Sequence, residues 1–412
     1  MAGGAPPSSG GPTVSSSSSS SSSGLPPPPP PPKILLAKPA GAAAAQRLGR
    51  EDDPSAVVHR SRNAAQPGSL NLFSESWEFH TDRILPFLTE NSDFTVIGII
   101  GPPGVGKSTI MNELYGFDGS SPGMLPPFAT HSDETRAMAK HCTTAIELRV
   151  SAERLILLDA QPIFSPSILV DMMRPDGSSA ISVLNGEALS ADLAHELLGV
   201  QLGVFLASVC NVLLVVSEGI HEFNMWQLML TVDLLKHGIP DPSLLTSAYT
   251  QRSNSGLDKE NKGNDQATNE EFLAAPVFVH SKLQNKDLAP SKTLLVRKAL
   301  LKFFGSSSFK VNNSRTSSLN KTAEDLDSEQ PYLFLLPMKV QHNLRKPQFE
   351  SYLSMIGKLR DEILSMNGHP FARNITEREW LRNSAKIWEL VKKSPTIADY
   401  CRTLQGSGLF RK

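Results

Sequence analysis

Cysteine is scarce in this sequence. Three of the 412 residues are cysteine (Cys142, Cys210 and Cys401), and no two of them share CxxC spacing. An odd and scattered set does not form a disulfide framework, and it does not indicate a zinc site. We therefore expect a protein of a reducing compartment, with the cytoplasm as its location and the nucleus as a second possibility.

Neither sign of charge is in excess, and no long apolar run is present. The 40 basic and 41 acidic residues give a net charge of −1, so no overall field attracts nucleic acid or an anionic membrane. The longest apolar run, 202–216, is about 15 residues long and contains Ser208 and Asn211, whereas a membrane span needs about 20. No N-terminal signal pattern is seen. We expect no direct nucleic-acid partner, no membrane association, and a buried helix running into a buried strand at 202–216.

Large apolar side chains are almost missing from residues 1–68. This stretch holds a serine run at 15–23 and a proline run at 26–32. Such a composition buries too little apolar surface to offset the entropy of ordering, so we predict a disordered tail. The proline run fits either a polyproline II ligand for an SH3- or WW-type module or a solvated spacer, and composition favours the spacer.

Residues 69–340 are predicted to form one α/β domain. Apolar, β-branched strands alternate with helical patterns, which favours a mostly parallel sheet with helices on both faces. Polar inserts near 250–270 and 306–329 fall between elements, where insertions cost little. The predicted strands are 94–100, 144–150, 154–159, 211–217, 276–280 and 332–336, and the predicted helices are 70–87, 107–115, 191–207, 223–237 and 291–304.

Residues 347–412 are predicted to be a helical segment that packs on the domain or on a partner. Trp380 and Trp388 lie in this segment. Tryptophan is enriched both at interface hot spots and in ordinary cores. A regulatory subunit would expose these apolar side chains to a partner; the alternative is that they cover the core of the domain itself.

One motif carries specific chemistry. Residues 101–108 read Gly-Pro-Pro-Gly-Val-Gly-Lys-Ser and match the P-loop pattern G-x-x-x-x-G-K-[ST] in full, between an apolar strand and a helical pattern. The glycines let main-chain N–H groups form an anion nest, the lysine reaches the β- and γ-phosphates, and the serine hydroxyl ligates Mg²⁺. The helix that begins there adds its positive dipole end. The alternative is a vestigial loop that holds no ligand. The predicted nucleotide-binding residues of the loop are Gly101, Gly104, Val105, Gly106, Lys107, Ser108 and Thr109.

A second, metal-side element should be an acidic residue at the end of a neighbouring strand. Asp159 ends the apolar run 154–159, and we predict that it contacts Mg²⁺ through water while Ser108 binds the ion directly. An aspartate of a turn or of a helix N-terminus is the alternative. Thr143 or Thr144 could supply a further hydroxyl to the metal or the γ-phosphate, although threonine is also common in strands. Thr143 is included in the predicted site.

The residues needed for hydrolysis are altered. In GTPases the strand-ending aspartate begins D-x-x-G, the glycine N–H contacts the γ-phosphate, and a following glutamine orients the attacking water. Here Pro162 has no N–H to donate, and Gln161 precedes it. We therefore predict absent or very slow hydrolysis and no catalytic residue.

Base recognition is altered too. The N-K-x-D position reads Ser281-Lys282-Leu283-Gln284. Lys282 can still pack along a base, but Gln284 is not an anionic acceptor, and loss of a paired polar contact lowers discrimination. ATP and GTP both remain open, with a slight preference for ATP.

The segment 157–169, Leu-Leu-Asp-Ala-Gln-Pro-Ile-Phe-Ser-Pro-Ser-Ile-Leu, resembles the SMG-nine family of nonsense-mediated mRNA decay factors. The stretch 380–404, the P-loop and the proline-rich tail resemble it as well. Beyond the tail, the likeness covers roughly residues 69–405. It implies a G-domain-like, catalytically weak subunit that pairs with an SMG-eight subunit. It also implies that the pair binds the SMG phosphatidylinositol-kinase-related kinase and restrains phosphorylation of the up-frameshift helicase. The chain departs from the family at Ser281, where asparagine is expected.

Two functions from different classes follow. The first is a nucleotide-stabilised regulatory scaffold. The second is an active P-loop NTPase or small-molecule kinase, which needs a positioned base and often an arginine. Arg136, Arg149 and Arg154 are available, but none lies in a recognisable motif. Direct RNA binding finds little support, because the Lys/Arg clusters are short and lack interleaved aromatics.

Overall fold

The structure is a computed structural model of the chain. It describes residues 70–117, 125–130, 135, 138, 140–173, 189–245, 272–309, 332–339, 349–366 and 370–408. All of these belong to one unit, Ala64–Lys412. The predicted tail 1–68 and most of the two polar inserts lie outside the described residues, so those predictions stay predictions.

A six-stranded sheet forms the centre of this unit, in the order β2-β3-β1-β4-β5-β6. The β1–β3, β1–β4, β4–β5 and β5–β6 pairs are parallel, and β2–β3 is antiparallel. The mostly parallel sheet with helices on both faces confirms the predicted G-domain-like α/β class. The strands are β1 (Thr95–Ile100), β2 (Ile146–Val150), β3 (Leu155–Ala160), β4 (Val212–Glu218), β5 (Ala275–Leu283) and β6 (Tyr332–Pro337).

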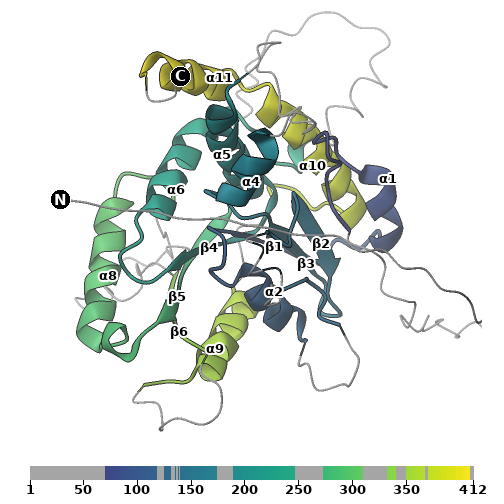
Figure 1. Ribbon diagram of the computed structural model, residues 1–412. Helices are drawn as coiled ribbons and strands as arrows, with labels where there is room; N and C mark the ends of the chain where they lie inside the picture. Colours follow the sequence, from purple (N-terminus) through teal and green to yellow (C-terminus); the bar gives the residue numbers. More distant parts are fainter. Residues whose placement is uncertain are drawn as a thin grey trace, which may run out of the picture. The chain divides into compact units, whose positions relative to one another are not determined.

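The strands are apolar on both faces because helices cover both (Figure 1). Along β1, Val96 and Ile100 join one core cluster, whereas Ile97 and Ile99 join the other. Near-continuous β-branched runs are expected where a parallel sheet is buried on both sides. The helices are α1 (Thr81–Ile84), η1 (Leu85–Phe87), α2 (Lys107–Tyr115), α4 (Pro166–Met173), α5 (Ala191–Val209), α6 (Asn224–Leu235), η2 (Asn285–Asp287), α8 (Pro290–Phe303), α9 (Tyr352–Ser365), α10 (Glu377–Lys392) and α11 (Pro395–Gly406).

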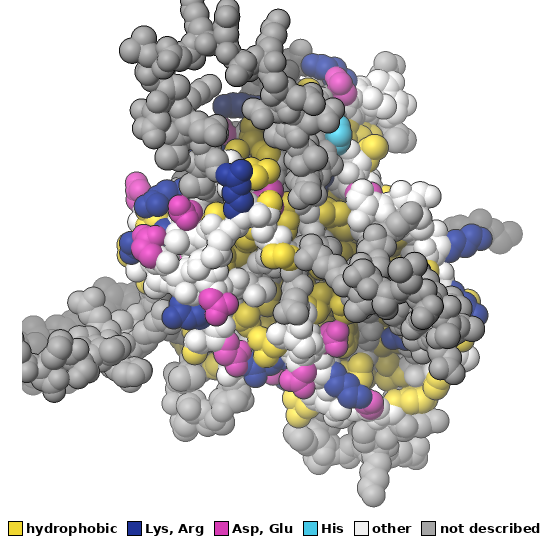
Figure 2. All heavy atoms as spheres, turned by 180° about the vertical axis from the view of Figure 1, so that it is seen from behind, with side chains coloured by type: hydrophobic (Ala, Val, Ile, Leu, Met, Phe, Trp, Pro, Cys, Tyr) yellow, Lys and Arg dark blue, Asp and Glu magenta, His cyan; other side chains and the backbone are white. Residues whose placement is uncertain are grey.

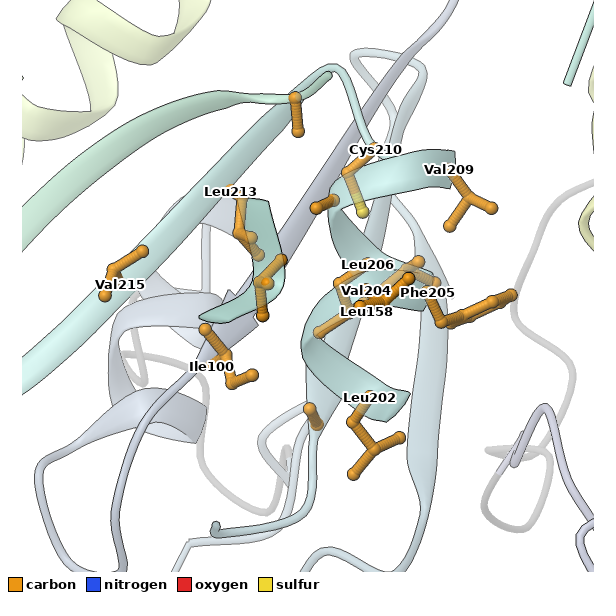
Figure 3. Packing of buried hydrophobic residues seen from close by; sticks show 14 of the residues in the cluster. Ile100, Leu158, Leu202, Val204, Phe205, Leu206, Val209, Cys210, Leu213 and Val215 are labelled. Atoms are coloured by element: carbon orange, nitrogen blue, oxygen red, sulfur yellow. The ribbon is translucent and has the colours of Figure 1, made fainter. Parts of the chain in front are cut away.

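Helix α5 lies at the centre of the larger core cluster. Its Leu206 side chain lies toward Leu213 of β4, whereas Phe205 points away from Leu213 (Figure 3) and contacts the rings of Phe73 and Trp388. Among the described residues, only α5 is long and apolar enough to cross a membrane, and 83% of its most apolar window is buried inside the protein. The prediction for 202–216 is confirmed: α5 ends at Val209 and β4 begins at Val212.

The C-terminal helices pack on the domain itself. Helices α10 and α11 contact α5, and α9 contacts β6 and α2 on the other face. Trp380 and Trp388 are 0% and 1% exposed. Their indole N–H groups donate to the carbonyls of Val209 (2.8 Å) and Trp77 (2.9 Å). The expectation that these two tryptophans form an exposed partner face is therefore wrong, because both fill the core beside α5.

The predicted helix over 70–87 is also wrong for most of its length. Leu72 N–H donates to the carbonyl of Ile146, and Leu148 N–H donates to that of Leu70, so this segment pairs with the outer edge of β2. Only the short α1 and η1 follow, with Pro86 inside η1. Edge pairing satisfies the backbone of both segments and prevails over the apolar spacing.

Candidate functional site

The P-loop connects the carboxyl end of β1 to the first turn of α2. Gly104 and Gly106 adopt φ of 76° and 95°, a left-handed region that favours glycine. Gly101 is required for a different reason: a Cβ there would lie 2.4 Å from the carbonyl oxygen of Val216 in β4. Each motif glycine thus meets a geometric constraint of a tight turn against the sheet.

Lys107 is buried at the centre of this turn. Its Nζ donates to the carbonyl oxygens of Gly101 and Pro102, both at 2.9 Å, and its residue is 6% exposed. Burial lowers the pKa of Lys107 to about 8, an effect partly offset by the nearby Asp159 carboxylate. The ammonium group is held where the loop backbone turns, which suits contact with a polyphosphate.

Ser108, Thr143 and Asp159 meet beside the lysine. The Ser108 hydroxyl donates to Asp159 Oδ2 at 2.6 Å, and the Thr143 hydroxyl donates to the same oxygen at 3.1 Å. Asp159 is 0% exposed, and its Oδ1 has no hydrogen-bond partner. Burial raises the pKa of Asp159, against the lowering effect of Lys107 and the two hydroxyls.

This donor set fits a magnesium ion. Mg²⁺ prefers oxygen ligands and takes one or two from the protein, with water and phosphate oxygens completing its shell. Ser108 and Asp159 supply a hydroxyl and a carboxylate, and the unpartnered Asp159 Oδ1 is an oxygen available for a water or an ion. Among the described residues no cluster of three or more His, Cys, Asp or Glu side chains suggests a softer metal.

Gln161 is engaged away from this corner. Its side-chain Oε1 accepts from Ala145 N–H at 2.8 Å, and its own N–H donates to the Ala145 carbonyl at 2.7 Å. It is 6% exposed. The residue therefore pairs with the chain next to Thr143 and Thr144. The following Pro162 has no N–H, and the next N–H, that of Ile163, donates to the carbonyl of Gly101 at 3.2 Å.

The carboxyl end of β5 contacts the P-loop directly. The Ser281 hydroxyl donates to the Val105 carbonyl at 2.8 Å. Lys282 follows with φ of 57°, and its Nζ lies 3.9 Å from the position that a Cβ on Gly104 would take. It also pairs with Glu218 at 2.9 Å. Asp287 does not reach this place, since its carboxylate accepts from Lys292 Nζ and from Gln284 N–H within η2.

The structure brings most of the sequence-predicted residues together. The loop glycines, Lys107, Ser108, Thr143 and Asp159 share one corner, and Lys282 lies over the loop. Thr109 occupies the first turn of α2. Thr144 accepts instead from Asn71 Nδ2 at 3.2 Å, so Thr143 is the threonine at the site. Nucleotide and metal binding by these residues stays a prediction. The sequence analysis missed Glu218 and the Ser281 contact; the acidic residue directly after the predicted strand 211–217 was the available signal for Glu218.

Known proteins resemble the chain over most of its length. No family model matches it. The nonsense-mediated mRNA decay factor SMG9 of Xenopus tropicalis is 28% identical over 359 residues, covering 82% of this chain and 67% of the relative. That of Salmo salar is 26% identical over 344 residues, covering 78% and 64%. SMG9 of Caenorhabditis elegans is 30% identical over 164 residues, covering 40% of each chain. The chain thus spans about two thirds of the length of the vertebrate relatives. A septin GTPase domain from Chlamydomonas reinhardtii matches with a TM-score of 0.25 and 10% identity, covering 76% of this chain and 98% of that one.

Proposed function

We propose that this chain, which belongs to the SMG9 family of nonsense-mediated mRNA decay factors, is a nucleotide-binding regulatory subunit of that pathway. One observation carries the proposal: Lys107, Ser108, Thr143 and Asp159 converge at the end of a P-loop whose glycines all meet their geometric constraints. The ligand is ATP or GTP with Mg²⁺, with a slight preference for ATP.

Different residues hold different parts of the ligand. Main-chain N–H groups of the loop and the ammonium of Lys107 hold the β- and γ-phosphates. Ser108 ligates Mg²⁺, and Asp159 contacts it through water. The metal would supply positive charge against the phosphates. Lys282 packs along the nucleoside.

The subunit is a scaffold and not an enzyme. Hydrolysis needs a group that orients the attacking water and an N–H for the γ-phosphate. The side-chain oxygen of Gln161 accepts a hydrogen bond from Ala145 N–H, and Pro162 has no N–H to donate to the γ-phosphate. The bound nucleotide then acts as a cofactor that stabilises the fold, because a ligand that binds only the folded state adds to its stability.

The partner is an SMG-eight-like subunit, and the pair binds the SMG kinase that acts on the up-frameshift helicase in the cytoplasm. Helices α6 and α8 support a protein partner, since they pack together through Trp226 and Phe303 and carry several exposed leucines. Leu234 and Leu295 are 72% and 67% exposed. These exposed leucines are apolar side chains that a protein partner could cover.

Direct contact with nucleic acid is not part of the proposal. Among the described side chains on the face drawn in Figure 2, acidic and basic ones are interspersed around apolar ones, and neither sign forms a continuous patch. A protein that neutralises phosphates with several lysines or arginines would show a basic stripe.

Two measurements on the purified protein test the proposed lack of catalytic activity and the proposed partner-binding helices. Steady-state phosphate release with ATP and GTP should stay far below the usual enzyme range of about 1–1000 per second; turnover within that range would favour the NTPase alternative. In a pull-down with the SMG-eight-like subunit, a Leu234→Asp/Leu295→Asp variant should lose binding. The matched control is Leu353→Asp, since Leu353 is 60% exposed on α9. Equal retention by all three proteins would remove α6 and α8 as the interface.

A further inference from the structure

The end of the candidate site away from Lys107 contains an ion pair that no step of phosphate binding uses. Glu218, the last residue of β4, pairs with Lys282 of β5 at 2.9 Å. The two side chains are 54% and 41% exposed. Exposed pairs of this kind contribute little to stability, so the pair calls for another explanation.

The backbone on both sides of Glu218 is fixed. The residue before it, Ser217, has its hydroxyl 2.8 Å from His280 Nδ1. The residue after it, Gly219, donates its N–H to the Ser281 carbonyl at 3.0 Å, and its own carbonyl accepts from His280 Nδ1 at 2.7 Å. Glu218 therefore has an exposed side chain on a backbone that hydrogen bonds hold in place. Its carboxylate can contact another group with little further loss of backbone entropy.

Lys282 is fixed in the same way. Ser281 is anchored to the Val105 carbonyl, and the β5–β6 register shifts between His280 and Leu283. Lys282 takes a left-handed φ at this irregularity, which is uncommon for a residue other than glycine. Such conformations cluster at ligand clamps when the surroundings impose them. The result is an ammonium group above Gly104 with Glu218 on its other side.

We propose that Glu218 is a positioning residue for nucleoside recognition: by pairing with Lys282 it holds that side chain over Gly104, where the lysine stem forms one wall of the nucleoside end. The proposal rests on the proposed nucleotide binding and adds to it. With its charge satisfied by Glu218, Lys282 offers its methylene stem to the flat face of a base and does not compete with Lys107 for phosphate.

The test separates the nucleoside end from the phosphate end by choice of ligand. Binding of ATP, GTP and inorganic tripolyphosphate, each with Mg²⁺, is measured by calorimetry for the wild type, Glu218→Gln, Lys282→Met and the double variant. Tripolyphosphate occupies the P-loop but has no nucleoside. Glu222→Gln is the control, since Glu222 lies in the same β4–α6 connection and forms no ion pair with a described residue.

We expect Glu218→Gln to weaken the better-bound nucleoside triphosphate about three- to fivefold, as an exposed charge pair allows. Tripolyphosphate affinity should stay within about twofold, and the double variant should be no weaker than Lys282→Met alone. Melting temperatures without ligand should be unchanged, and Glu222→Gln should behave as the wild type.

Several results would overturn the inference. One is an equal change for tripolyphosphate and nucleotide with Glu218→Gln, which would indicate a general field effect. Another is no change at all, or additive losses in the double variant. If the wild type binds tripolyphosphate as tightly as nucleotide, the nucleoside end makes no contact and only this inference fails. If it binds none of the three ligands, the proposed function itself fails.

Discussion

The two ends of the candidate site differ in burial and in how they are built. At the phosphate end, Lys107 and Asp159 are 6% and 0% exposed and are held by short hydrogen bonds to the loop and to Ser108. At the nucleoside end, the side chains of Lys282 and Glu218 are 41% and 54% exposed. Buried charges tolerate little change because an unpaired partner is costly, whereas exposed pairs can be replaced at small cost. From this difference we expect polyphosphate binding to be the constrained property and base choice to be the variable one.

The largest effect should come from the buried lysine. Lys107→Ala removes a charge-assisted contact to the phosphates, so we expect about 100-fold weaker nucleotide binding. The melting temperature with nucleotide present should fall, because the bound ligand no longer stabilises the folded state. Calorimetry and thermal melting measure both, with exposed Lys298→Ala as the control. Unchanged affinity would place the phosphates elsewhere and would remove the contrast between the two ends.

Gln161 tests whether the phosphate end is also catalytic. Gln161→Ala leaves the buried N–H of Ala145 without its acceptor, so we expect a loss of about 1–3 kcal/mol in the free energy of unfolding. Phosphate release should not change. Denaturant unfolding and a phosphate-release assay are the two measurements. A variant with normal stability and slower release would instead make Gln161 a catalytic residue.

The pH dependence of binding follows from the lowered pKa of Lys107, about 8. A bound phosphate keeps the ammonium protonated, whereas the free protein loses that proton above pH 8. Affinity should therefore be flat from pH 7 to 8 and fall by up to about tenfold per unit above it.

The ligand-free fold should respond with the opposite sign. Its lysine pKa lies below the unfolded value of 10.5, so between these two values the unfolded chain binds the extra proton and stability rises with pH. Calorimetry between pH 7 and 9 checks the binding slope. Lys107→Met should lack it, and a wild type without a slope would contradict the assignment of Lys107.

Ser281 should give the smallest effect. Ser281→Ala removes the donor to the Val105 carbonyl, and we expect about three- to fivefold weaker nucleotide binding through a less fixed loop. Ser281→Thr keeps the hydroxyl and should stay near the wild type. A loss as large as that of Lys107→Ala would mean that the two ends are not separable.

Much of the fold followed from local patterns. The strand 94–100, the helix 107–115 and the P-loop between them were predicted because each is written in consecutive residues with a distinct period or motif. The prediction of a helix over 70–87 was wrong because the backbone of this segment pairs with β2. That contact cannot be inferred from the residues of the segment alone. Trp380 and Trp388 were ambiguous from sequence alone, because burial against α5 depends on tertiary packing.

The same distinction holds within the candidate site. Asp159 could be expected at the metal side because it ends an apolar strand near the loop. Glu218 ends an apolar strand too, but its pairing with Lys282 depends on the β4–β5 register, in which Glu218 lies opposite Ser281. From sequence, Gln161 could only be excluded as the catalytic glutamine. Its structural role could not be predicted, since it pairs with Ala145, 16 residues away in the chain.

Mass spectrometry of the small molecules released from the purified, denatured protein shows whether the P-loop holds a nucleotide. We expect close to one equivalent of an intact nucleoside triphosphate from the wild type and none from Lys107→Ala. Release of nucleoside diphosphate alone would show that the chain cleaves what it binds, and the absence of any nucleotide from the wild type would contradict the site.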